Sequence, residues 1–270
     1  MKEMLLSLTI LCLSFTQVFS QSAKEYYNSG CLNIEHNDYP SAIKDFNKAI
    51  EINPQYTEAY YNRGTIKYSI HDYRGAILDF TKVIEINPHF KDSYLNRGTA
   101  KCSLQDYGGA IMDYNKAIEI DPNEGDAYYG RGISKDSLQD YRGAIQDFTK
   151  TMEINPKDSE ACLNRGVAKF FLLDYKGAVI DYNKAIEINP NYGDAYYSRG
   201  EAKYVLQDGK GAIMDFNKAI EINPQFAKAF WDRGVAKYSL GDKNGACLDW
   251  SKAGELGLMT AYDLIRKYCK

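Results

Sequence analysis

Residues 57–90 alternate between apolar and polar positions with the period of a helix, interrupted once. Small and aromatic residues recur every three to five positions as far as Tyr68, and a second apolar stripe runs from Tyr73 to Ile86. Such spacing predicts two amphipathic helices with a short turn between them. Asp72 precedes the second stripe, where a carboxylate can accept the free N–H groups of the first helical turn. Pro88 disfavours helical geometry at Asn87 and ends the unit, which we interpret as a helix hairpin.

The same pattern returns along the chain at a shift of 34 residues. The phrase NRG recurs at Asn62, Asn96 and Asn164, and EINP recurs from Glu51 to Glu221. Seven such units cover residues 23–260, and an acid stands at the cap position of every one: Asp38, Asp72, Asp106, Asp140, Asp174, Asp208 and Asp242. A single hairpin cannot bury its apolar face, whereas stacked hairpins can, so the pattern predicts one linear array.

The unit resembles the tetratricopeptide repeat in length and in its order of aromatic, glycine, small and proline positions. In residues 57–90 these positions hold Tyr60, Gly64, Ala76, Phe80, Val83 and Pro88. The resemblance implies an all-α fold, a right-handed superhelical solenoid of seven helix-turn-helix units. It also implies that the first helices line a concave groove that binds peptides or other proteins.

The two ends of the chain depart from the repeat. Residues 1–20 contain a short basic start and an apolar run, which is typical of a signal peptide cleaved before Gln21. The alternative is a hydrophobic first helix packed on the first repeat. We expect residues 21–260 to form the seven repeats and residues 261–270 to form a capping helix, with Leu264, Ile265 and Tyr268 facing inward. We therefore expect a bacterial protein that is secreted, or resides in the periplasm or cell envelope, with no membrane span in the mature chain.

Three positions of the repeat carry Arg, Lys and Asp together. Arg and Lys are four residues apart and share a helix face, while Asp belongs to the second helix of the same hairpin. The Arg–Asp pairs are Arg63 with Asp79, Arg97 with Asp113, Arg131 with Asp147, Arg165 with Asp181, Arg199 with Asp215, and Arg233 with Asp249. Because a half-buried charge needs a partner, we interpret these residues as a structural ion ladder. A basic row that binds a ligand is the alternative.

The groove positions follow from the resemblance. They hold Tyr61, Asn62, Asp92, Asn96, Asp126, Tyr129, Glu160, Leu163, Asn164, Asp194, Tyr197, Glu201 and Trp231. Asn amides can pair with a peptide backbone, and Tyr offers amphipathic contact area at low entropy cost. The acids predict a negative trough that prefers neutral to basic segments, with solvated groove edges as the alternative.

Signals for catalysis and metal binding are absent from the sequence. The histidines His36, His71 and His89 fall in turns without partners at ligand spacing. The net charge of −3 has mixed signs and lacks the basic stripe that nucleic acid requires. We predict no catalytic residues, no metal site and no cofactor. Of the six cysteines, Cys247 and Cys269 are the two that can meet, in the last repeat and its cap.

The sequence thus favours a non-enzymatic, monomeric scaffold that binds an extended segment of another protein. An architectural role is the alternative, in which the array assembles with itself or spaces the subunits of an envelope complex. A carbohydrate groove built from Tyr and Trp is a third reading. A receptor that clamps a terminal carboxylate is disfavoured because the groove positions hold almost no Lys or Arg.

Overall fold

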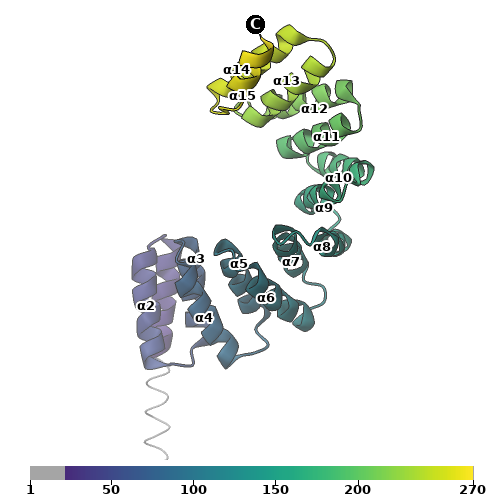
Figure 1. Ribbon diagram of the computed structural model, residues 1–270. Helices are drawn as coiled ribbons and strands as arrows, with labels where there is room; N and C mark the ends of the chain where they lie inside the picture. The colour runs from purple at the N-terminus through teal and green to yellow at the C-terminus, as the bar shows by residue number, and fades with distance from the viewer. Residues whose placement is uncertain (1–21, 270) are drawn as a thin grey trace, which may run out of the picture. The chain divides into compact units, whose positions relative to one another are not determined.

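A computed structural model describes residues 22–269, and every regular element within them is a helix (Figure 1). The first helix spans residues 22–35. The helices that follow are α2 (Tyr39–Ile52), α3 (Thr57–Ser69), α4 (Tyr73–Ile86), α5 (Lys91–Ser103), α6 (Tyr107–Ile120), α7 (Gly125–Ser137), α8 (Tyr141–Ile154), α9 (Ser159–Phe171), α10 (Tyr175–Ile188), α11 (Gly193–Val205), α12 (Gly209–Ile222), α13 (Ala227–Ser239), α14 (Lys243–Glu255) and α15 (Ala261–Tyr268). The predicted all-α array of helix pairs is confirmed. The proposed signal peptide lies outside the described residues.

The cap acids start the second helix of each hairpin. Asp72 accepts a 2.9 Å hydrogen bond from the Gly75 N–H, and the other cap acids accept the equivalent bond. The residue before the cap takes a left-handed backbone, with a φ of 64° at His71. The second helices of the first six hairpins then end at an Asn or Asp that precedes proline, as at the extended Asn87. Local sequence therefore sets where the hairpin turns and where it stops.

The core of each hairpin is an aromatic ring against a glycine. Phe80 of α4 is fully buried and lies over Gly64 of α3. In the fifth hairpin a Cβ on Gly166 would lie 2.5 Å from Cε1 of Tyr182, so no larger residue fits without a shift. Fully buried alanines such as Ala59 and Ala76 let the two helices approach closely. This packing explains why the repeat fixes small and aromatic residues together.

Residues 22–269 divide into two compact units, with the division between residues 130 and 131, inside α7. In the described part of the first unit, α2 to α5 each pack against the helix that follows, up to α6. In the second unit the same order holds from α8 to α15. No helix among residues 22–269 is both long enough and apolar enough to cross a membrane.

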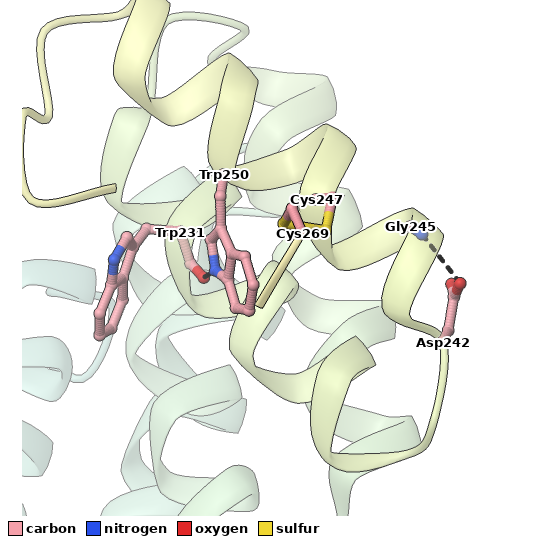
Figure 2. Close-up of a disulfide and its surroundings, with 6 residues drawn as sticks. All are labelled: Trp231, Asp242, Gly245, Cys247, Trp250 and Cys269. Atoms are coloured by element: carbon pink, nitrogen blue, oxygen red, sulfur yellow. Dashed lines mark hydrogen bonds between the residues drawn. A yellow bond between two sulfur atoms is a disulfide. The ribbon is translucent and has the colours of Figure 1, made fainter. Parts of the chain in front are cut away.

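The last hairpin packs against α15, and a disulfide links α14 to the end of α15. Trp250 of α14 is buried, and Leu258, Leu264, Ile265 and Tyr268 pack around the cluster that contains it. Figure 2 shows the bond between Cys247 and Cys269, whose Cα atoms are 5.8 Å apart. The Trp250 indole N–H donates a 3.2 Å hydrogen bond to the carbonyl of Trp231, which ties α14 to α13 (Figure 2). Cys31, Cys102 and Cys162 are unbridged thiols.

Candidate functional site

The charged positions of the repeat meet inside each hairpin. Arg63 places Nε 2.9 Å and Nη2 2.6 Å from the two oxygens of Asp79, and Lys67 Nζ lies 2.8 Å from the same carboxylate. The same triad forms around Asp113, Asp147, Asp181, Asp215 and Asp249. These six aspartate side chains are only 2–6% exposed. Each carboxylate is therefore a buried charge held by two cations.

Arginines of the ladder also reach the preceding hairpin, as five of them show. Arg165 Nη1 donates a 3.1 Å hydrogen bond to the Thr149 hydroxyl on α8. Equivalent bonds run from Arg63 to Asn47, from Arg97 to Thr81, from Arg199 to Asn183, and from Arg233 to Asn217. Because the guanidinium donates in three directions within the fold, it has little capacity left for a ligand. The contacts favour a structural ladder over a ligand-binding row.

The first repeat replaces the cations of the ladder with neutral donors. Ser29 Oγ lies 2.6 Å, and Asn33 Nδ2 2.9 Å, from Oδ2 of Asp45. Asp45 is half-buried, whereas the ladder aspartates of the later repeats are buried. The chain thus holds its most exposed ladder carboxylate with hydrogen bonds alone.

Two of the predicted groove rows contact one another. Asn96 Nδ2 donates a 2.9 Å hydrogen bond to the Tyr61 hydroxyl, and Asn62 Nδ2 donates a 3.1 Å bond to the Tyr27 hydroxyl. Each bond joins the first helices of neighbouring hairpins. In these repeats the amide nitrogen is therefore used within the fold, and the amide oxygen is the end left to meet a peptide backbone.

The predicted acids of the trough differ in their surroundings. Asp92, Asp126, Glu160 and Asp194 are exposed and stand in the first turn of α5, α7, α9 and α11. An acid in the first turn also complements the helix dipole, so these positions have a purely structural explanation as well. Glu201 is instead half-buried.

The remaining groove residues are more covered than a binding surface requires. Leu163 is buried and belongs to the core cluster around Tyr182. Tyr129, Asn164, Tyr197 and Trp231 are half-buried. The exposed part of the predicted groove is therefore mostly its acids.

One hollow gathers several of these side chains at the C-terminal end of the second unit. Its volume is about 310 Å³, and its lining comprises Tyr197, Glu201, Lys228, Trp231, Asp232, Leu258 and Thr260. Tyr197 and Glu201 are four residues apart on α11, and Lys228 and Asp232 are four apart on α13, so each pair shares a helix face. We call these seven residues the C-terminal pocket.

Within the C-terminal pocket, Tyr197 links the two helices. Its hydroxyl donates a 2.7 Å hydrogen bond to Oδ2 of Asp232 and also lies within hydrogen-bonding reach of Glu201. This bond takes the place that the Tyr–Asn bonds hold in the first unit, with a carboxylate in place of the amide. Two acids are thus brought to one phenol.

Burial makes both acids weak, and repulsion from Asp232 weakens Glu201 further. Burial raises the pKa of Glu201 to about 7, and the charge of Asp232 adds to that rise. Burial likewise raises the pKa of Asp232 to about 6. The Tyr197 hydrogen bond and the nearby Lys228 ammonium pull both pKa values back down. Near neutral pH, the positive charge of Lys228 therefore does not fully compensate the two carboxylates of the pocket.

Sequence reasoning included Tyr197, Glu201 and Trp231 among groove residues but missed Lys228, Asp232, Leu258 and Thr260 as their neighbours. A signal was present in the repeat register. Glu201 is the only acid at the ninth position of a repeat, and Asp232 is the only acid at the sixth. Two such departures in consecutive repeats indicate a local feature. Among the described residues no group of three or more His, Cys, Asp or Glu side chains could hold a metal ion.

Comparison with family models agrees with the helix-pair architecture. A model described as TPR repeat matches residues 33–70, 98–134 and 174–207. Two models described as Tetratricopeptide repeat match residues 57–90 and 193–226. No curated protein matches the chain in sequence.

Solved structures extend the same likeness over most of the chain. A tetratricopeptide repeat protein from Parabacteroides merdae is 24% identical with a TM-score of 0.69, covering 93% of this chain and 100% of its own. MamA is 28% identical with a TM-score of 0.57, covering 61% of this chain and 96% of its own. YrrB, described as a TPR protein with an unusual peptide-binding site, is 24% identical with a TM-score of 0.59, covering 68% and 95%.

Proposed function

Because the chain belongs to the tetratricopeptide repeat family, we propose that it is a non-catalytic scaffold that binds an extended segment of another protein. The segment lies along the first helices of the repeats, and one of its Lys or Arg side chains enters the C-terminal pocket. The observation that carries this proposal is the pair of half-buried acids, Glu201 and Asp232, beside the Tyr197 hydroxyl.

A cation suits the pocket for a simple electrostatic reason. Burial raises the pKa of both carboxyl groups, and the charge of Asp232 raises that of Glu201 further, so Glu201 still holds part of its proton near pH 7. An incoming ammonium or guanidinium group replaces that proton with a fixed positive charge and stabilises both carboxylates. Trp231 lines the same hollow and offers an indole ring beside the cation. Binding should therefore release protons near pH 7.

In the absence of a ligand, Lys228 supplies a positive charge next to the two acids. Its side chain lines the pocket, and its charge lowers the pKa of both acids, yet the residue is exposed. A long, exposed lysine can leave the pocket at small cost when a ligand cation enters. We therefore expect Lys228→Ala to strengthen the binding of a basic segment.

Selection from a displayed library of random peptides on the immobilised protein tests the proposal. Peptides enriched on the wild type should share a Lys or Arg, and Glu201→Gln with Asp232→Asn should remove that preference without lowering the melting temperature. The matched control is Glu85→Gln with Glu119→Gln, two exposed acids on second helices. Enrichment of acidic peptides, or of none, would contradict the proposed ligand.

The proposal also places the protein in an exported compartment. It rests on the apolar run in residues 1–20 and gains support from the Cys247–Cys269 disulfide, since such bonds persist in oxidising surroundings. N-terminal sequencing of protein from its native host should find Gln21 or a residue close to it. Recovery of intact Met1 in a soluble cytoplasmic fraction would contradict export.

A further inference from the structure

The turn of the fifth hairpin consists of apolar residues alone, whereas the other turns each include a polar residue. It reads Phe171-Leu172-Leu173, against Ser69-Ile70-His71 and Ser103-Leu104-Gln105 in earlier repeats. Phe171 is 55% exposed and Leu173 is 70% exposed. The chain thus presents three large apolar side chains to solvent at one tip.

Leu173 also occupies an unfavourable backbone conformation. Its φ is 64°, in the left-handed region, where branched side chains are uncommon. The equivalent positions hold Asn37, His71, Gln105, Gln139, Gln207 and Gly241, all polar or glycine. A leucine at this position has an unfavourable backbone conformation, and its side chain is not buried. Its contribution to the stability of the fold therefore does not explain its presence.

The apolar tip is held in place by neighbouring rings. Phe171 stacks on Tyr141 of α8, with centroids 5.1 Å apart and planes 9° from parallel. Phe170 lies edge-on to Tyr175, with centroids 5.0 Å apart. Fixed rings keep the exposed side chains from folding back onto the hairpin, which reduces the entropy lost when they contact another surface.

The turn of the sixth hairpin also exposes apolar side chains. Val205 stands where most repeats have serine, and Val205 and Leu206 are both exposed. Equivalent turns of consecutive hairpins follow one edge of the array because α9 to α12 pack in sequence order. We call Phe171, Leu172, Leu173, Val205 and Leu206 the apolar turn edge.

Exposed cations flank the apolar turn edge. Arg142, Lys176 and Lys210 are the second residues of α8, α10 and α12, and all three are exposed. Within residues 22–269 none of the three forms an ion pair. The neighbouring cap acids, such as Asp174, direct a carboxylate oxygen to a helix N–H. The surface therefore combines apolar side chains with cations free to meet anions.

We propose that the apolar turn edge docks on the surface of an anionic lipid bilayer. A row of hairpin turns is a ridge, and its five residues are not among those that line the C-terminal pocket, so a broad surface suits it better than an enclosed peptide. A bilayer interface deforms around inserted Phe and Leu side chains, while Lys and Arg meet its anionic headgroups. This contact goes beyond the scaffold function, because it uses the turns and leaves the first helices for the protein segment.

Co-sedimentation of the full chain with vesicles tests the proposal. Phosphatidylcholine vesicles with about 30% phosphatidylglycerol should bind the protein, and Phe171→Ser with Leu173→Gln should weaken partitioning about tenfold relative to wild type. The matched control is Leu78→Gln on α4, because Leu78 is also 70% exposed and repeat four carries Gln146 at that position. The control should bind as wild type does.

A local probe separates this edge from the apolar N-terminal residues, which every variant shares. In Phe171→Trp, brominated lipids should quench the new fluorescence in anionic vesicles and leave it unchanged in phosphatidylcholine alone. Absent quenching, equal binding to neutral vesicles, or an equal loss in Leu78→Gln would overturn the proposal. So would a dimer in solution that Phe171→Ser with Leu173→Gln abolishes, because the edge would then belong to a second copy of the chain.

Discussion

Tyr197 and Asp232 join two successive hairpins through a 2.7 Å hydrogen bond from the phenol to the carboxylate. The bond brings Asp232 beside Glu201, which stands one turn after Tyr197 on α11. Two acids on neighbouring first helices thus share one phenol and one electrostatic field. This end of the array therefore holds two carboxyl groups whose charge state changes near neutral pH.

Stability at the C-terminal end should fall as pH rises. The folded-state pKa values of Glu201 and Asp232 are about 7 and about 6, above the usual values of free carboxyls. The folded chain therefore binds more protons than the unfolded chain in this range, and unfolding becomes easier as those protons are lost. We expect the free energy of unfolding to drop by about 1–3 kcal/mol between about pH 5 and pH 8.

Tryptophan fluorescence is suited to this measurement because both tryptophans, Trp231 and Trp250, lie in the last hairpin. Glu201→Gln with Asp232→Asn should flatten the pH dependence, and Asp92→Asn, at an exposed first-turn acid, should leave it as it is. A wild-type chain equally stable at both pH values would show that the two acids are solvated.

Loss of one ladder arginine should be costly. Arg165→Leu removes two hydrogen bonds from the buried Asp181, which keeps only Lys169 as a charged partner. We expect a loss of roughly 2–4 kcal/mol in chemical denaturation, because the remaining carboxylate is desolvated and under-compensated.

Two further variants make the ladder measurement decisive. Arg165→Leu with Asp181→Leu should recover more than half of the loss, since no unpaired charge remains. Lys218→Leu breaks an exposed pair with Glu221 and should cost less than about 1 kcal/mol. A neutral Arg165→Leu would mean that the ladder contributes nothing to stability.

The fold was predictable because the sequence contains the same pattern of cap, glycine and aromatic positions seven times. Asp72, Gly64 and Phe80 each have one physical role, namely cap, close approach and core ring, and each role recurs at a fixed spacing. The ladder partners were also predictable, because Arg63 and Lys67 share a face toward Asp79. The repeat period and the positions of the charged residues are enough to predict such contacts when the repeats share the same residues.

The C-terminal pocket was harder to predict because it depends on departures from the repeat. The sequence assigns Glu201 to a groove position, but its approach to Asp232 through Tyr197 depends on how one hairpin is set against the next. Likewise, spacing indicates that Cys247 and Cys269 can meet, whereas their bond depends on where α15 ends. Such features follow from packing between units and not from any one unit.

Removal of the disulfide should loosen the last hairpin. The Cys247–Cys269 bond closes a segment of 22 residues, which corresponds to roughly 3 kcal/mol of loop entropy in the unfolded chain. Cys247→Ala with Cys269→Ala should therefore lower the stability reported by tryptophan fluorescence by about 2–3 kcal/mol. Cys31→Ala with Cys102→Ala, at half-buried thiols, serves as the comparison. An equal loss in both variants would assign the effect to packing instead of the bond.

Relief of the backbone at Leu173 should stabilise the chain. Leu173→Gly removes a side chain from a left-handed position with a φ of 64°. We expect a gain of about 1 kcal/mol in denaturant unfolding, measured against the wild type. Leu172→Gly, at a neighbouring residue of normal φ, should be neutral or destabilising. A loss in Leu173→Gly would show that the leucine supports the fold.

The central claim is that the C-terminal pocket binds a positively charged side chain of a protein segment. A double-mutant cycle tests it most directly, using a peptide enriched by display, its Lys-to-norleucine analogue, and the Glu201→Gln with Asp232→Asn variant. On the wild type the loss of charge should weaken binding about tenfold, and on the variant it should change the affinity little. An equal effect of the norleucine change on both proteins would contradict the claim and place the recognition of charge outside this pocket.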